Sequence, residues 1–322
     1  MQFYTYLIFD EVEKYFKFQA IIKGNILYIG EIAALATAAL WSVTSIFFSE
    51  ASVKVSSIIV NITRLILAAI FLLATVIIFD IPINISNSQI IMLVISGAIG
   101  FVFGDSFLFK AFQHIGARLS MLIMSISPAM SAVLAYYFLG EILSAWSIVG
   151  VLVTIGGIAM VVLYREEKPS SDYKKSNIGI FYGFLGALGQ AVGLIFAKYA
   201  FIQSDINGFW AALIRVSAAI FFMFPLFFLI KRIRNPIKIF RAEKKALKYT
   251  ALGSFTGPYL GVTLSLISIT YAKVGIAATL MGTVPIIMLP IVRYFYKEKL
   301  GLVSVLGAIL AVCGIAILFL KS

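Results

Sequence analysis

Two stretches of equal length decide the fold: SPAMSAVLAYYFLGEILSAWSIVGVLVTIGGIAMVVL at 127–163 and VPIIMLPIVRYFYKEKLGLVSVLGAILAVCGIAILFL at 284–320. Laid on each other without a gap, they match a proline, a glutamate and two glycines: Pro128 with Pro285, Glu141 with Glu298, Gly150 with Gly307 and Gly157 with Gly314. Each stretch is an apolar run, a short polar turn and a second apolar run. The chain therefore contains an internal repeat.

The repeat extends upstream of these stretches. The match continues without a gap back to Gly97 and Ser254, and it pairs two more glycines in each copy: Gly100 with Gly257 and Gly104 with Gly261. Further upstream, Arg64 in NITRLILAAIF corresponds to Arg215 in ALIRVSAAIFF after a one-residue adjustment.

Composition identifies the solvent in which the chain folds. Of its 322 residues, 61% are hydrophobic and 12% are charged, and the mean hydropathy is +1.03. A water-soluble globule of this size is far less apolar. A helix needs about 20 apolar residues to cross the hydrocarbon core of a bilayer. Ten such runs are predicted, near 29–49, 56–79, 89–112, 118–139, 145–164, 178–201, 208–230, 248–271, 276–296 and 302–320.

Each half holds five runs, and this odd number determines how the halves are related. A copy that follows five spans enters the membrane from the opposite side, which gives inverted repeats, a construction common in secondary transporters. We therefore predict an all-α integral membrane protein with ten transmembrane helices as two inverted five-helix repeats. The predicted division is an amphipathic or partly disordered tail at 1–28, a first repeat at 29–164, a linker at 165–177 and a second repeat at 178–322.

The charged and metal-binding residue types limit the possible partners. The net charge of +12 comes mostly from Lys and Arg in short segments between apolar runs, which indicates contact with anionic lipid and no nucleic acid. Cys313 is the only cysteine and His114 the only histidine, so an intrachain disulfide and a Cys or His metal cage are excluded. We expect no metal and no cofactor.

In its order of elements the chain resembles the EamA-type branch of the drug/metabolite transporter superfamily. The resemblance lies in a helix with Arg near its start, a Gly-rich helix, a proline followed after twelve residues by a glutamate, and a closing Gly-rich helix, all present twice. The segments AALWSVTSIFF and GALGQAVGLIFAKYA also look like the first helix of each EamA unit. The resemblance covers about 29–321.

This resemblance implies both a fold and a class of activity. It implies ten helices around a central cavity, lined chiefly by the first, third and fourth helices of each repeat. It implies a carrier that exports or exchanges amino acids, other metabolites or drugs. Nucleotide sugars and sugar phosphates are the solutes of related branches.

Two arginines lie inside apolar runs, where each costs roughly 2.5–3.5 kcal/mol on insertion scales. Arg64 and Arg215 can serve as positive anchors for an anionic group of the substrate. Alternatively, each snorkels to the near interface or bonds to loop carbonyls and so holds its repeat together. We favour this structural role, because both halves carry the arginine and one substrate needs only one asymmetric site.

Asp105 is the only acidic residue deep inside an apolar run. A buried carboxylate can take up a proton, so Asp105 is a candidate for proton coupling or for binding an amine. Its equivalent in the second repeat is Val262, so the charge breaks the symmetry. A structural ion pair has the same signature, with Lys110 or Lys198 as the neutralising partner.

Other polar and helix-breaking residues complete the candidate site. Hydrogen-bonding groups near mid-membrane must find a neighbouring helix or a ligand, so the predicted substrate-binding set is Trp41, Thr44, Ser45, Asp105, Gln190 and Tyr259. Pro128 and Pro285 interrupt helices, which exposes backbone groups to a ligand or serves packing. Glu141 and Glu298 are expected to cap or tie loops at the interface.

These observations predict a multi-pass protein of the cell membrane that carries a small organic solute, such as an amino acid, by alternating access, and that works as an exporter. The alternatives are a membrane-embedded enzyme and a scaffold without transport. The first lacks clustered catalytic residues, and the second does not need two exchangeable halves. The expected partners are the solute, the lipid bilayer and, through Asp105, protons. The oligomeric state is left open.

Charge also predicts the orientation. Lys and Arg are far more numerous in the set of alternate segments that includes 165–176 and 231–248. By the positive-inside rule these segments face the cytoplasm and both termini lie outside, whereas the family habit is cytoplasmic termini. We favour the charge rule.

Overall fold

A computed structural model of the chain describes residues 29–140, 144–163, 176–203, 206–229, 236–271, 280–297 and 300–320. The predicted tail at 1–28, most of the linker, Glu141 and Glu298 lie outside the described residues. Within the described ranges the regular structure is helical, with no strand. The predicted all-α class is confirmed.

The helices follow the predicted apolar runs. They are α2 (Ile29–Lys54), α3 (Ser57–Ile78), α4 (Asn87–Gly97), η1 (Ala98–Gly104), α5 (Asp105–Met124), α6 (Ser127–Leu139), α7 (Ala145–Leu163), α8 (Asn177–Gln203), α9 (Gly208–Leu229), α10 (Pro236–Ala242), α11 (Lys244–Ser254), η2 (Phe255–Gly261), α12 (Val262–Tyr271), α14 (Val284–Phe295) and α15 (Leu302–Leu320). The elements η1 and η2 are π-helical. Each continues directly into its neighbours, so that the first half has a rod from Asn87 to the turn at Gly116 and the second half has one over 244–271.

Length and apolarity establish a polytopic membrane protein. Six helices of the described part are long and apolar enough to cross a bilayer, namely Ile29–Lys54, Ser57–Ile78, Asn87–Met124, Ala145–Leu163, Asn177–Gln203 and Gly208–Pro225. Three shorter apolar helices, Ser127–Leu139, Val284–Phe295 and Leu302–Leu318, accompany them. Many of the large apolar side chains on these helices are exposed, as expected where lipid is the solvent.

Gly116, which lies within Asn87–Met124, separates the third and fourth predicted spans. Its backbone has φ 72° and ψ 174°, a conformation that glycine adopts easily and that other residues rarely do. The chain therefore turns here. In the structure the third span ends at this glycine. The fourth span runs from Ala117 to Leu139 and has a second break at Ser125 and Ile126.

The fourth and ninth predicted spans are both interrupted. Helical turns give way to a short turn at Ser125 and Ile126 in the first repeat, and at Gly282 and Thr283 in the second. A new helix then starts with proline in its first turn, Pro128 in α6 and Pro285 in α14. Proline suits this position because the first turn of a helix needs no N–H donor from it.

The internal repeat is reproduced in the helix bounds. Adding 157 to the bounds of α4, η1 and α7 gives those of α11, η2 and α15, so that Ala98 corresponds to Phe255 and Leu163 to Leu320. The same shift carries the start of α6 at Ser127 to the start of α14 at Val284. The two copies therefore share even the position of a seven-residue π-helical segment.

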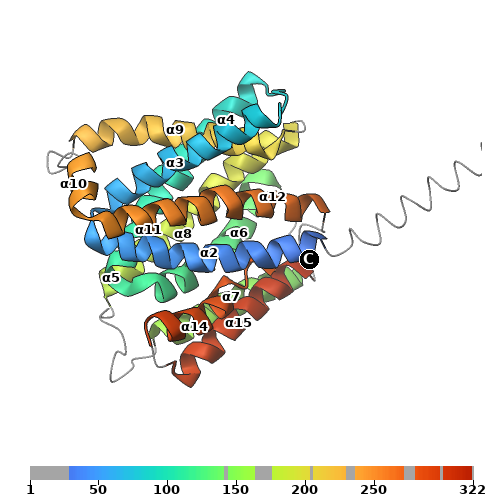
Figure 1. Cartoon of the computed structure of the whole chain (residues 1–322). Coiled ribbons are helices and arrows are strands. Elements are labelled where there is room, and N and C mark those ends of the chain that lie inside the picture. Colours follow the sequence, from blue (N-terminus) through green and yellow to red (C-terminus); the bar gives the residue numbers. More distant parts are fainter. Residues whose placement is uncertain are drawn as a thin grey trace, which may run out of the picture.

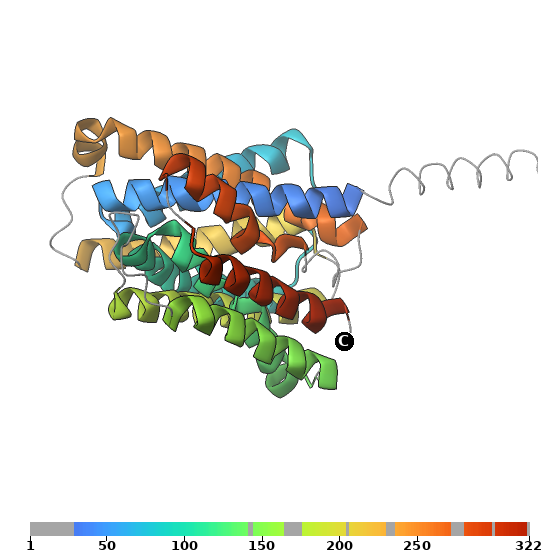
Figure 2. The ribbon, with the colours of Figure 1, turned by 90° about the horizontal axis from the view of Figure 1, so that it is seen from below.

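The helices lie side by side, with their axes running between two ends of a bundle (Figure 1). One end, marked by α10, is called the α10 end. The other, where the C-terminus lies, is called the C-terminal end. The helix α2 begins at the C-terminal end and finishes at the α10 end. Figure 2 shows α7 and α15 beside each other on one side of the bundle.

The two repeats exchange their first helices. The helix α2 of the first repeat packs on α11, η2 and α12 of the second, while α8 of the second packs on α4, η1 and α5 of the first. Glycine makes these contacts close. A Cβ on Gly189 would lie 2.5 Å from Gly104 Cα, and a Cβ on Gly257 would lie 2.5 Å from Thr44 Cγ2. The halves are therefore interlocked.

The last helices of the repeats, α7 and α15, pack tightly on each other. A Cβ on Gly157 would lie 2.5 Å from Ala311 N, and a Cβ on Gly314 would lie 2.4 Å from Thr154 N. Small residues let the two backbones approach, which is how helices associate where lipid removes the hydrophobic driving force.

Candidate functional site

A cluster of five polar side chains lies inside the bundle where four helical elements meet. Asn61 and Arg64 come from α3, Asp105 from the start of α5, Gln190 from α8 and Arg215 from α9. We call this set the polar cluster. It draws α3 and α5 from the first repeat and α8 and α9 from the second.

Arg64 and Asp105 form a buried ion pair at the centre of the polar cluster. The Arg64 Nη2 atom donates to Asp105 Oδ2, and both side chains are only 8% exposed. The Arg64 Nε atom donates to Asn61 Oδ1 at 2.9 Å. Asp105 thus pairs with Arg64, where Lys110 or Lys198 was the expected structural partner.

Aromatic rings surround the Arg64 guanidinium. Its Cζ atom lies 5.1 Å from the ring centroid of Phe109, 5.6 Å from that of Phe48 and 5.9 Å from that of Phe101. These ring faces attract a cation, and they exclude water from the ion pair. Arg64 is therefore held by a carboxylate, an amide and three aromatic rings.

Gln190 holds the second oxygen of Asp105. Its Nε2 atom lies 2.5 Å from Asp105 Oδ1 and also donates to the Gly100 carbonyl at 3.2 Å. Asn61, which accepts from Arg64, is itself held in place, because its Nδ2 atom donates to the Phe101 carbonyl at 3.0 Å and lies 3.2 Å from Ser106 Oγ. The carboxylate is thus bound by a charged and a neutral donor.

Arg215 differs from Arg64 although the repeat makes them equivalent. Its Cζ atom lies 4.6 Å from the ring centroid of Phe101, and its charge interacts with that of Asp105. Its Nε atom is buried, and it has no hydrogen-bond partner among the residues that the structure describes. Two guanidinium groups therefore share one carboxylate, and the polar cluster carries one net positive charge.

Three predicted site residues on α2 lie apart from the polar cluster, against the second repeat. Thr44 Oγ1 hydrogen-bonds to Thr256 Oγ1 at 2.7 Å. Ser45 donates to the Ser42 carbonyl at 2.7 Å. The Trp41 indole packs against Gly261, since a Cβ on this glycine would lie 2.5 Å from Trp41 Nε1.

Tyr259 of η2 packs against α3. Its hydroxyl is 3.2 Å from Thr75 Oγ1, and its ring packs 5.3 Å from that of Phe71 and 5.6 Å from that of Phe255. The structure thus brings together Asp105, Gln190 and the two arginines, but it places Tyr259 and the α2 residues elsewhere.

Sequence reasoning missed Asn61, which ties Arg64 to the backbone of η1 through Phe101. The signal was present, because Asn61 lies one helical turn before Arg64 within the same apolar run, where the two side chains are neighbours. The role of Phe101 between the two arginines could not be predicted, because it depends on how α3 and α9 pack on η1.

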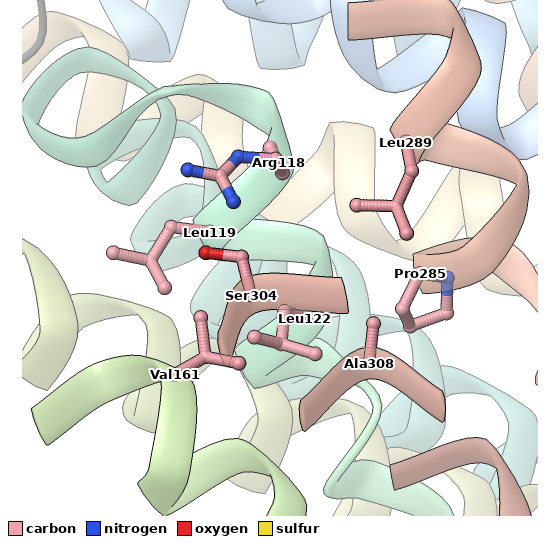
Figure 3. Close-up of a pocket in the computed structure, with 8 residues that line it drawn as sticks. All are labelled: Arg118, Leu119, Leu122, Val161, Pro285, Leu289, Ser304 and Ala308. Atoms are coloured by element: carbon pink, nitrogen blue, oxygen red, sulfur yellow. The ribbon is translucent and has the colours of Figure 1, made fainter. Parts of the chain in front are cut away.

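A small pocket lies between the fourth span, α7, α14 and α15 (Figure 3). Its lining is Arg118, Leu119, Leu122, Val161, Pro285, Leu289, Ser304 and Ala308. It has room for little more than one water molecule. A metabolite does not fit in this pocket. Among the described residues, His, Cys, Asp and Glu form no group of three that could bind a metal.

The fold and the interlocked inverted repeats define a class, that of polytopic helical membrane proteins with the construction of secondary transporters. The family is shown directly. The model of the EamA-like transporter family matches 28–163 and again 177–320, and the chain belongs to this family. The predicted resemblance is confirmed, and membership points to a transporter and not to an enzyme.

The other comparisons add the fold alone. A search of curated proteins found no match. Solved structures do match, and one of them, titled "Crystal structure of protein", shares 15% sequence identity with a TM-score of 0.61. The alignment covers 92% of this chain and 99% of that one.

Proposed function

We propose that the protein is a secondary transporter that exports a small organic solute, an amino acid or related metabolite, across the cell membrane by alternating access. The observation that carries this proposal is the shift of 157 residues that relates the helix bounds of the two repeats. Two halves with the same construction can exchange conformations, and such exchange opens a site to each side in turn.

The interruptions in the helices support movement of this kind. Each repeat has a π-helical segment and, after the following helix, a break before a proline. π-Helical segments are rare, and they occur often at functional sites. Bends at the same positions in both halves let each half adopt the shape of the other.

Contacts between α2 and α14 support a state that is closed at the α10 end. The Tyr296 hydroxyl donates to Glu50 Oε1 at 2.8 Å near the ends of the two helices. Deeper in the bundle, Ser45 Oγ lies 3.6 Å from Met288 Sδ, and Ala38, Ile46, Val284, Met288 and Val292 form a shared apolar core. Opening this end requires these contacts to separate.

For the site residues, we propose that Trp41, Thr44, Ser45 and Tyr259 line the solute path in other states, and that Asp105 couples transport to protons. Protonation of Asp105 would weaken its ion pair with Arg64. Asp105→Asn is then expected to abolish gradient-driven uptake while exchange of solute for solute continues. Wild-type uptake by the folded variant would remove the coupling role.

The transport proposal is tested with purified protein in liposomes loaded with a broad panel of labelled amino acids and other metabolites. We expect efflux of at least one solute down its gradient, absent from protein-free liposomes. No flux of any solute, together with turnover of one of them into a product, would favour the enzyme. Absence of both flux and turnover would favour the third class, a membrane scaffold without transport.

The proposed orientation has the α10 end in the cytoplasm and both termini outside. This follows from the excess of Lys and Arg in the segments at that end, where Arg241, Lys244, Lys245 and Lys248 are exposed. Single cysteines at Ser171 and Asn235 in a Cys313→Ala background test it. We expect no labelling of intact cells by a membrane-impermeant thiol reagent. Labelling of both would establish the opposite orientation.

A further inference from the structure

We propose that Arg215 is an anion subsite that binds a monovalent carboxylate group of the transported solute. This inference rests on the proposed transport function and deepens it by naming a substrate class. It starts from the difference between the two arginines of the polar cluster.

The first step is hydrogen-bonding capacity. Arg64 donates to Asp105 and to Asn61 and is enclosed by three rings. Arg215 has one ring, Phe101, and a buried Nε atom that lacks a partner among the described residues. An arginine inside a membrane protein is expensive unless its donors are satisfied. A bound ligand with acceptor oxygens satisfies them.

The second step is charge. Asp105 is the one acidic residue in the polar cluster, and both of its oxygens are already bound, one by Arg64 and the other by Gln190. The charge of Arg215 is therefore only partly balanced. One further negative charge would make the cluster neutral. A dianion such as phosphate would leave it negative and would be repelled by Asp105, so the charge count favours a monovalent carboxylate.

The third step is space. A Cβ on Gly100 would have Arg215 Nη2 at 3.5 Å, Gln190 Oε1 at 3.7 Å and Gly193 Cα at 4.0 Å as its nearest neighbours. These are ordinary van der Waals distances, so Gly100 leaves room for one methyl-sized group beside Arg215 and Gln190. By contrast, Gly97 has no such space, because a Cβ there would lie 2.2 Å from the Arg215 carbonyl oxygen. The backbone at Arg215 is thus packed closely against Gly97, while the guanidinium keeps a methyl-sized space beside Gly100.

The same geometry argues against an amine as the primary group recognised here. An ammonium group would meet a cluster that already carries one net positive charge, and each Asp105 oxygen already accepts a hydrogen bond from Arg64 or Gln190. The planar guanidinium of Arg215 offers paired N–H donors that match a carboxylate. An amino acid fits through its carboxylate, and its ammonium group then lies elsewhere.

The test measures binding to the purified full chain in detergent by thermal stabilisation and by competition. The probes are matched triads: an amino acid, its amide, and the carboxylic acid that lacks the amine, built on alanine, leucine and phenylalanine. We expect saturable binding by members of at least one triad that carry the carboxylate and at least about tenfold weaker binding by the amide. Preference for the amide, or no carboxylate binding in any triad, would overturn the inference.

Arg215→Gln, Arg215→Lys and Arg241→Gln are compared in the same assay. Arg215→Gln should weaken carboxylate binding at least about tenfold with no change for the amides, and Arg215→Lys should weaken it less, because it keeps the charge without the planar fork. Arg241→Gln removes the same charge from an exposed position and should have no effect. Unchanged carboxylate affinity in Arg215→Gln would contradict the subsite.

Flux in liposomes separates this inference from the proposed function. If the protein moves only solutes without a carboxylate, transport stands and the anion subsite fails. If it moves no solute at all while carboxylates bind at Arg215, the subsite stands and the transport proposal fails.

Discussion

The start of α5 in the first repeat and the start of α12 in the second occupy equivalent positions but have opposite character. Adding 157 to Asp105 gives Val262. Asp105 lies in the polar cluster with Arg64 and Gln190. In the second repeat, Gly261, directly before Val262, packs against Trp41 of α2. The backbone is symmetric and the chemistry is not.

This difference separates two requirements of a carrier with inverted repeats. Exchange of conformations needs two halves of similar shape, and shape depends on where helices begin, bend and pack. Recognition of one solute needs a single asymmetric arrangement of charges. Shape and charge are therefore specified at adjacent positions: glycine is present in both repeats, as Gly104 and Gly261, whereas Asp105 is present in only one.

The largest expected effect distinguishes the two equivalent arginines. Arg64→Met leaves Asp105 buried without its ion-pair partner, and breaking a buried pair costs about 3–5 kcal/mol. Arg215→Met leaves the Asp105–Arg64 pair intact. We expect a large loss of thermal stability in detergent for the first variant and a small one for the second.

The double variant Arg64→Met with Asp105→Leu checks the cause. Removal of both charges is expected to recover most of the lost stability, because no unpaired charge remains. Equal melting temperatures for Arg64→Met and Arg215→Met would mean that the two arginines are structurally equivalent after all.

A second prediction transfers the charge to the other repeat. Val262→Asp places a carboxylate at the equivalent position, while Arg215, the equivalent of Arg64, lies over Phe101 beside Asp105. An unpaired Asp in a membrane helix costs roughly 2.5–3.5 kcal/mol. We expect a clear loss of thermal stability, with Val262→Ala as the milder control. Wild-type stability of Val262→Asp would show that the second repeat also offers a partner for a carboxylate.

A smaller effect tests the symmetric part of the comparison, at the contact between α7 and α15. Gly157→Ala places a Cβ 2.5 Å from Ala311 N, and Gly314→Ala places one 2.4 Å from Thr154 N. We expect similar destabilisation in both, of about 1–3 kcal/mol for overpacking. Gly156 is the matched control, because its Cβ would meet no atom within 4 Å, and Gly156→Ala should retain or slightly raise stability. A loss confined to one of the first two variants would mean that the contact is not symmetric.

Much of the fold could be predicted from the sequence, because apolar length and an internal match of glycines and prolines are local properties of the chain. The expected gap between the third and fourth spans contains Gly116, where the structure has its break. The π-helical segments could not be predicted in this way. Pro258 marks an interruption within η2, but apolar length does not indicate a π-helical turn, and both segments depend on the close packing of η1 on α8 and of η2 on α2.

The candidate site was only partly predictable for a related reason. The sequence drew attention to Arg64, Asp105, Gln190 and Arg215, because a polar side chain in an apolar run is expensive. It did not pair them, because helical periodicity gives the face of a residue and not the helix that this face meets. Arg64 and Asp105 are 41 positions apart and meet only through the packing of α3 on α5.

The central claim is that the α10 end must open and close during transport, and a reversible crosslink between α2 and α14 tests it most directly. Cysteines replace Glu50 and Tyr296, whose side chains share a hydrogen bond of 2.8 Å, in a Cys313→Ala background. A short thiol-cleavable bifunctional reagent then joins them in the protein reconstituted in liposomes. The account predicts that solute flux stops on crosslinking and returns on reduction, while each single-cysteine variant treated in the same way keeps its flux. Undiminished flux through fully crosslinked protein would contradict it.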